Sequence, residues 1–230
     1  MNRSIPTLIY TWQDLLAIVG LAGLYGLLAK AVLTYFSASG NVTLIWFSGG
    51  LGLAVLLQKG LRYWPGIFIG AFAAGLMVDD ALWLSTCIAV GNTLESACAA
   101  WLLKRNPRFS VSLSQPQHFL WLAVVGIICA VISASIGPWS LWLAGFLTTA
   151  QLLGTALHWW MADVFGIIFT TPLLLIWHGW PGSWFRLRRL PETLLFVSLT
   201  IFSGQVLFSD WLTSQLSFAP HTYWTFFFIF

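Results

Sequence analysis

The sequence predicts an all-α fold, a polytopic integral membrane bundle of about eight transmembrane helices. Charged residues make up only 7% of the 230 positions, whereas aromatic residues make up 17%. Long apolar runs repeat along the chain, and the fifteen tryptophans fall mainly near their ends. A helix needs about 20 residues to cross roughly 30 Å of hydrocarbon, and the runs lack the alternation of a barrel strand. The spans are therefore expected to be helical.

The predicted elements follow one another closely. Five runs are long enough, or nearly so, to span the membrane: 15–36, 82–103, 119–136, 159–177 and 194–207. Two shorter runs, 42–58 and 64–78, flank a small basic loop and form either two further spans or a re-entrant hairpin. The eighth run, 223–230, is expected to be cut short. Residues 1–230 are thus interpreted as one domain, an N-terminal fragment of a longer protein.

Basic residues occur in every second loop. Lysine and arginine cluster at 59–62, 104–108 and 186–189, and the intervening loops carry acidic residues with no Lys or Arg. Basic loops of membrane proteins remain in the cytoplasm, so the N-terminus is predicted to be cytoplasmic as well.

The remaining composition argues against several classes of function. The tryptophans suit interfacial belts, and the basic inner loops account for the pI near 8.9, so nucleic-acid binding is not predicted. Cys87, Cys98 and Cys129 lie within apolar runs without CxxC spacing or a nearby histidine. They are interpreted as small buried hydrophobic residues. No metal site and no cofactor are predicted.

Three ionisable residues, Lys30, Glu95 and Asp163, lie within spans, where a charge costs about 3 kcal/mol. Asn92 shares a helix face with Glu95, and Trp159 with Asp163. Counted along each run, Lys30 and Asp163 lie about 9 and 6 Å below the outer end, and Glu95 about 20 Å below it. Lys30 and Asp163 are therefore predicted to pair, either as a structural ion pair or within a ligand-binding or switch site. Glu95 is predicted to serve function with Asn92, or else to be a protonated structural carboxyl.

Small residues and one proline predict how the helices pack. Gly66, Gly70 and Ala74 put a small side chain at every fourth position of the third run, and glycines also line part of the first. Pro172 cannot donate a backbone hydrogen bond, so the sixth span should kink below Asp163. The kink is either architectural or a hinge.

A catalytic motif is hard to find. Ser48 and His158 invite comparison with an intramembrane serine protease, but Trp46 stands where such an enzyme has a glycine two residues before its serine. Both residues are interpreted as packing or interfacial residues, and no catalytic residue is predicted.

The chain resembles a known family in five segments that follow one another in the family's order. These segments are IWFSGGLGLAVLL (45–57), GLRYWPGIFIGAF (60–72), GNTLESACAAWLLKR (91–105), SASIGPWSLWLAG (133–145) and WWMADVFGIIFTTPLLL (159–175). Together they are similar to the membrane-associated sensor domain of the first type, the MASE family of bacterial signalling proteins. The resemblance covers roughly residues 15–230, with Phe47 and Ala162 replacing the family's usual proline and glycine.

The resemblance implies an eight-helix sensory module of the bacterial inner membrane without enzymatic activity of its own. Such a module detects a stimulus, which the sequence does not identify. It regulates a cytoplasmic output domain in the same chain, either a diguanylate cyclase, which makes cyclic di-GMP, or a histidine kinase of a two-component system. Its partners are the lipid bilayer and that output domain, and the sequence leaves open a second copy or another membrane protein.

The alternative is a transporter or transporter-like small-molecule binding protein, whose intramembrane charges would be coupling or substrate sites. Internal symmetry would favour it, and the two halves show no convincing repeat.

Overall fold

The protein, seen here in a computed structural model, is described at residues 10–35, 37–39, 42–43, 45–78 and 81–177, and at four helical positions, 190, 191, 194 and 198. The chain divides into two compact units, Met1–His178 and Gly179–Phe230. The description below concerns the first unit.

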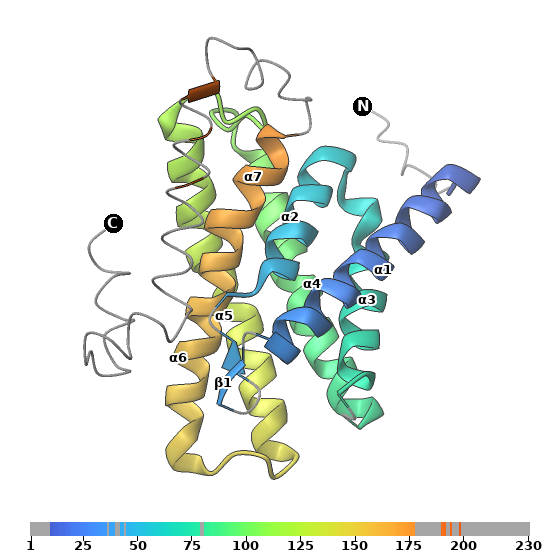
Figure 1. Cartoon of the computed structure of the whole chain (residues 1–230), viewed down its shortest axis with the longest axis vertical. Helices are drawn as coiled ribbons and strands as arrows, with labels where there is room; N and C mark the ends of the chain where they lie inside the picture. Colours follow the sequence, from blue (N-terminus) through green and yellow to red (C-terminus); the bar gives the residue numbers. More distant parts are fainter. Residues whose placement is uncertain are drawn as a thin grey trace, which may run out of the picture. The chain divides into compact units, whose positions relative to one another are not determined.

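The described part of this unit is built mainly of helices (Figure 1), which confirms the predicted all-α class. The α-helices are α1 (Trp12–Tyr35), α2 (Phe47–Lys59), α3 (Trp64–Leu76), α4 (Leu82–Arg105), α5 (Pro116–Leu143), α6 (Thr149–Phe165) and α7 (Thr171–Ile176). The 3-10 turn η1 (Leu61–Tyr63) links α2 to α3, and the π-helical segment η2 (Gly166–Thr170) links α6 to α7.

The predicted second run differs from the structure at its start. A short antiparallel pair, β1 (Ser37–Ser39) and β2 (Val42–Thr43), joins α1 to α2, so the helix begins at Phe47 and not at residue 42. Val42 and Thr43 are β-branched residues, which favour extended backbone.

Among the described residues, four helical stretches are long and apolar enough to cross a membrane: Trp12–Tyr35, Leu82–Arg105, Pro116–Leu143 and Thr149–Ile176. Four of the predicted spans are therefore supported. The runs at 194–207 and 223–230 lie outside the described residues apart from positions 194 and 198. The eight-helix count stays a prediction.

The sixth span begins ten residues earlier than the sequence analysis placed it, at Thr149 and not at 159. The cause is a capping box. The Thr148 side chain bonds the backbone of Gln151, while the Gln151 side-chain oxygen accepts from the Thr148 backbone N–H at 3.0 Å. Such a box satisfies N–H groups that would be orphaned at a helix start.

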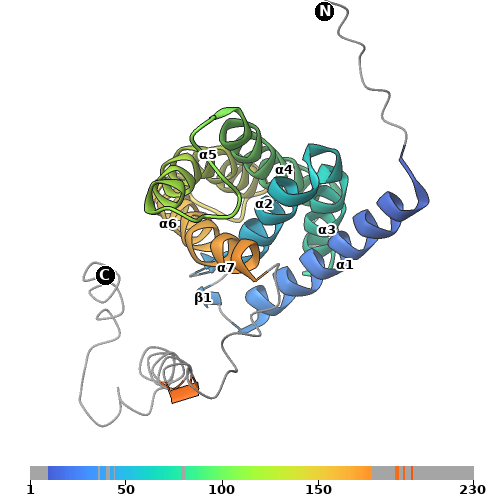
Figure 2. The ribbon, with the colours of Figure 1, turned by 90° about the horizontal axis from the view of Figure 1, so that it is seen from above.

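Helix α2 occupies the middle of the unit. Figure 2 shows it surrounded by α1, α3, α4 and α7, and nine of its thirteen residues are buried. At 13 residues, α2 and α3 are each roughly 20 Å long, shorter than the hydrocarbon layer. A pair of further spans and a re-entrant hairpin both stay predictions for these two helices.

Glycines bring α1 and α3 into close contact, as the small-residue spacing predicted. A Cβ on Gly66 would lie 2.9 Å from the Ile18 carbonyl oxygen, and one on Gly70 would lie 2.7 Å from that of Ala22. Gly26 faces Gly70 across the same contact. Gly20 and Gly23 have nothing within 4 Å, so the packing interpretation does not extend to them.

Large apolar side chains cover the outside of the unit. Val19 on α1, Ile128 on α5 and Leu153 on α6 are 68%, 58% and 72% exposed. A continuous apolar exterior is unfavourable in water and suits the acyl chains of a bilayer. Trp12, Trp83, Trp121 and Trp139 are also exposed, as the interfacial interpretation requires, whereas Trp46 and Trp159 are partly buried.

Candidate functional site

Three helices contribute to a buried polar cluster. Asn92 comes from α4, Ser133 from α5 and Trp159 from α6. The Trp159 indole N–H donates to the Ser133 hydroxyl at 3.0 Å, and that hydroxyl donates to the Asn92 side-chain oxygen at 2.9 Å. This chain of bonds holds α4, α5 and α6 in one register.

Two carboxyl groups lie beside this chain. Glu95 of α4 and Asp163 of α6 are each 1% exposed, and they interact with one another and with Ser133. Ser133 has a single hydroxyl proton, which it donates to Asn92. One carboxyl oxygen of Glu95, both of Asp163 and the Asn92 amide nitrogen have no hydrogen-bond partner among the described residues. The cluster therefore carries more acceptors than donors.

Within the described part of the chain, no lysine or arginine forms an ion pair with either of these carboxyls. The ion pair that is present joins Arg62 to Asp14. Two neighbouring carboxylates in a water-poor site cannot both remain ionised at low cost, since each opposes the other's charge. A hydrogen bond between them requires a proton on one, because ionised carboxylates only accept. One proton shared by the pair would leave a single net negative charge.

The predicted pairing of Lys30 with Asp163 is wrong. Lys30 is exposed on α1 and lies roughly 8 Å before the end of that helix at Tyr35. Asp163 lies roughly 21 Å after the start of α6 at Thr149, and Glu95 roughly 20 Å after the start of α4 at Leu82. Because the sixth helix begins earlier than expected, Asp163 is at the depth of Glu95 and not of Lys30.

The structure therefore brings together four of the five candidate residues, Asn92, Glu95, Trp159 and Asp163, and leaves Lys30 outside. Ligand binding and switching at these residues stay predictions.

A cavity of about 60 Å³ opens beside the cluster. Asn92, Trp159 and Asp163 line it together with Trp46, and most of its other walls are aliphatic residues of α1, α3, α4 and α5. It has room for about four water molecules. Of the thirteen described lining residues, only Asp163 has a charged side chain.

Backbone contacts join α2 to the helical span that carries Asp163. The Trp46 N–H donates to the Ala162 carbonyl at 2.9 Å, and the Thr171 hydroxyl donates to the Gly50 carbonyl at 3.0 Å. A Cβ on Gly166 would overlap the Trp46 carbonyl oxygen, and a Cβ on Gly50 would overlap the Gly166 carbonyl oxygen. The two elements approach this closely because both crossing positions are glycine.

The irregular backbone predicted near Pro172 takes the form of a π-helical segment, Gly166–Thr170, directly before α7. Proline cannot donate to the carbonyl four residues earlier and its ring crowds that group, so the regular α ladder is interrupted. The segment begins one turn after Asp163.

Ser48 and His158 bond to different backbone carbonyls. The Ser48 hydroxyl donates to the Tyr25 carbonyl at 3.3 Å, and the His158 Nδ1 lies 2.7 Å from the Gly154 carbonyl oxygen. This arrangement supports the interpretation of Ser48 as a packing residue.

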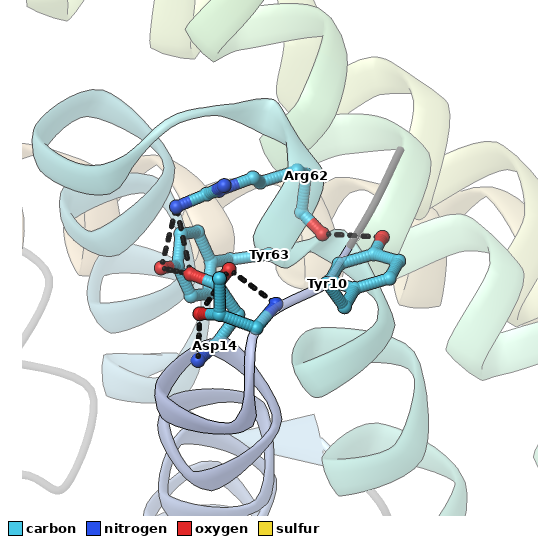
Figure 3. A network of polar contacts seen from close by, with 5 residues as sticks. Tyr10, Asp14, Arg62 and Tyr63 are labelled. Carbon is cyan, nitrogen blue, oxygen red and sulfur yellow. Dashed lines mark hydrogen bonds and ion pairs between the residues drawn. The ribbon is translucent and has the colours of Figure 1, made fainter. Parts of the chain in front are cut away.

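A second polar network lies at the N-terminal end of α1 and was not predicted from the sequence. The Asp14 carboxylate accepts from the Arg62 guanidinium at 2.7 Å and from the Tyr63 hydroxyl (Figure 3). It also accepts from the Thr11 N–H and hydroxyl, and the Tyr10 hydroxyl donates to the Arg62 carbonyl. Thr11 and Asp14 form the pattern of a capping box before an apolar run, which is the signal that could have revealed Asp14.

Replacing Asp14 with asparagine should lower the thermal unfolding midpoint by several degrees, because the carboxylate accepts two bonds from η1 and two from Thr11 at the start of α1. Arg62→Ala should have a smaller effect, since the Arg62 side chain is 45% exposed and water screens the ion pair. Thermal unfolding of the purified variants measures both. Equal losses would mean that the ion pair, and not the other bonds to Asp14, holds the network together.

The model of the MASE1 family matches residues 16–229 of this chain. The chain belongs to the MASE1 family. MASE1 is a membrane-associated sensory domain, and this agrees with the apolar helices described above. No curated protein and no solved structure matches this MASE1 chain.

Proposed function

We propose that this MASE1 domain is the sensory input of a longer protein of the bacterial inner membrane, with its N-terminus in the cytoplasm. It detects a stimulus at the Glu95–Asp163 cluster and regulates a cytoplasmic output domain that follows in the same chain. That output is a diguanylate cyclase, which makes cyclic di-GMP, or a histidine kinase of a two-component system.

One observation carries the proposal: Glu95 and Asp163 form an unbalanced pair of buried carboxyls, and Asp163 lies one turn before the π segment that crosses α2. Buried polar groups without partners destabilise the structure around them. A proton or ligand that binds to these carboxyls therefore changes the stability of the local structure. A π segment holds one extra residue in its turn. Converting it to α-helix would rotate α7 by about 100°, a motion that can pass along the chain toward the cytoplasm.

The orientation rests on the alternating charge of the loops. The Lys104–Arg105 pair ends α4, at the end of the bundle where α5 begins. The positive-inside rule puts that end in the cytoplasm and the β1–β2 end outside.

Cysteine labelling should test this orientation. In a background without Cys87, Cys98 and Cys129, a cysteine at Asp80 should react with an impermeant maleimide in intact cells, and one at Arg105 should react only after lysis. Position 188, outside the described residues, should behave as Arg105 does. Labelling of position 105 in intact cells would overturn the orientation.

Glu95→Gln in the full-length protein should change output activity at least about threefold in one direction without reducing membrane insertion, because it alters the proton count of the pair. Output is measured as cyclic di-GMP production or autophosphorylation. Thr86→Val, an exposed position of the same helix, is the control and should leave output unchanged.

Output that ignores Glu95→Gln and Asp163→Asn alike would contradict the proposal. Transport of a solute by the reconstituted protein without any signalling domain would favour the transporter alternative, which also uses intramembrane carboxyls near broken helices.

A further inference from the structure

The cavity beside the cluster has an unusual chemical balance. Both Asp163 oxygens are buried and without a partner, and Asp163 lines the cavity. The described lining residues include no lysine, arginine or histidine. A buried carboxyl of this kind requires a proton or a positively charged occupant.

Two indole rings complete the lining around Asp163. The Trp46 indole N–H donates to the Tyr25 hydroxyl at 3.2 Å, and the Trp159 indole N–H donates to the Ser133 hydroxyl. Since both N–H groups are engaged elsewhere, these rings present carbon surface to the cavity. Aromatic faces attract cations, most strongly where water is excluded.

The donor set suits an organic cation better than a metal ion. Sodium, calcium and magnesium ions need about six oxygen ligands, and the cavity offers few beyond Asp163. Asn92 has its side-chain oxygen engaged by Ser133, and its free group is an N–H donor, which repels a metal ion. The aliphatic walls favour a ligand with some apolar surface.

The volume of the cavity and the charge of the carboxyl pair further limit the class of ligand. A volume of about 60 Å³ admits a ligand of a few non-hydrogen atoms. If Glu95 and Asp163 share one proton, the site carries one net negative charge, which a single monovalent cation neutralises. An ammonium group also has N–H donors for an Asp163 oxygen that the shared proton does not occupy.

We infer that this cavity binds a small protonated amine, ammonium or a short primary alkylammonium ion, through the Asp163 carboxylate and the Trp46 and Trp159 rings. The identification of this ligand as the stimulus rests on the proposed sensory function, but binding itself does not.

The test uses the 230-residue chain in nanodiscs of phosphatidylcholine and phosphatidylglycerol, which carry no primary amine. Ammonium, methylammonium and ethylammonium chlorides are titrated at constant pH and ionic strength, with calorimetric heat and the thermal unfolding midpoint as readouts. Saturable heat and a midpoint that rises by a few degrees are expected. Sodium, potassium and tetramethylammonium chlorides should give neither effect, the last because of its size.

Asp163→Asn should weaken amine binding roughly tenfold or more, because it removes the charge that the ammonium group contacts. Asp14→Asn, the same substitution in the network at the other end of α1, is the matched control and should bind as wild type does. Val78→Trp keeps Asp163 but narrows the cavity at a partly exposed lining position, and it should also weaken binding. This variant decides the matter if Asp163→Asn does not fold.

The inference is overturned if wild type shows no amine effect, if sodium or potassium reproduces it, or if only pH shifts the midpoint, which would mean that protons alone occupy the site. Unchanged binding in both Asp163→Asn and Val78→Trp would also overturn it. Amine binding without any output response to either Glu95→Gln or Asp163→Asn would leave this inference standing and contradict the sensory proposal.

Discussion

Gly166→Val is expected to destabilise the domain by more than about 3 kcal/mol and to prevent its purification as a folded species. A Cβ at this position would overlap the Trp46 carbonyl oxygen and lie 2.7 Å from the Trp46 carbonyl carbon. Overpacking a core typically costs 1–3 kcal/mol where side chains can move aside. Here the obstacle is backbone, so α6 and the start of α2 must separate and lose the Trp46–Ala162 hydrogen bond.

The measurement is the free energy of unfolding in bicelles by steric trapping, together with the fraction of protein that is monodisperse after extraction. Gly154→Val is the matched control on the same helix, because a Cβ at Gly154 meets nothing within 4 Å. Valine is a slightly better helix former than glycine, so the control should be neutral or stabilise by less than about 1 kcal/mol. Similar losses in the two variants would show that α2 and η2 do not cross at Gly166.

The second large effect concerns the carboxyl pair. Glu95→Gln and Asp163→Asn should each change the free energy of unfolding, and the double variant should depart from their sum by about 1–3 kcal/mol. Each substitution replaces a carboxyl of the interacting pair with an amide, which always has N–H donors, so the effect of one substitution depends on the state of the other residue.

Lys30→Met combined with Asp163→Asn is the control cycle. Lys30 is exposed and at a different depth, so these two changes should add within about 0.5 kcal/mol. Additivity of Glu95 with Asp163, or coupling of Lys30 with Asp163, would contradict the arrangement of the cluster. Both cycles use the same unfolding measurement.

Asp163 was predicted to pair with Lys30 but lies beside Glu95, because the start of the sixth helix was misplaced. The sequence contains the signal for the correct start. The segment Thr148 to Gln151 has the capping-box pattern, but apolar content alone placed the start of the sixth span near Trp159. That error moved Asp163 about 15 Å toward the outer end and made Lys30 its apparent partner. The same pattern at Thr11 and Asp14 was also overlooked.

Other features could be predicted because they are local. The apolar runs predicted α1, α4 and α5, and the spacing of Gly66 and Gly70 predicted a close helix contact. The cost of burying charge in lipid singled out Glu95 and Asp163 from their positions within apolar runs. The same argument singled out Lys30, which is exposed on α1. Each of these inferences needs only the residues of one segment and the properties of the bilayer.

The sequence by itself determined that this chain is a helical membrane domain and which of its residues the membrane rejects. Only the tertiary structure decided that Glu95 meets Asp163, that Trp46 and Trp159 turn inward to a cavity, and that Gly50 and Gly166 touch. Burial in lipid is an interaction between one segment and its solvent, so it can be read along the chain. The choice of neighbours depends on how several helices fill space together, and no single segment carries that information.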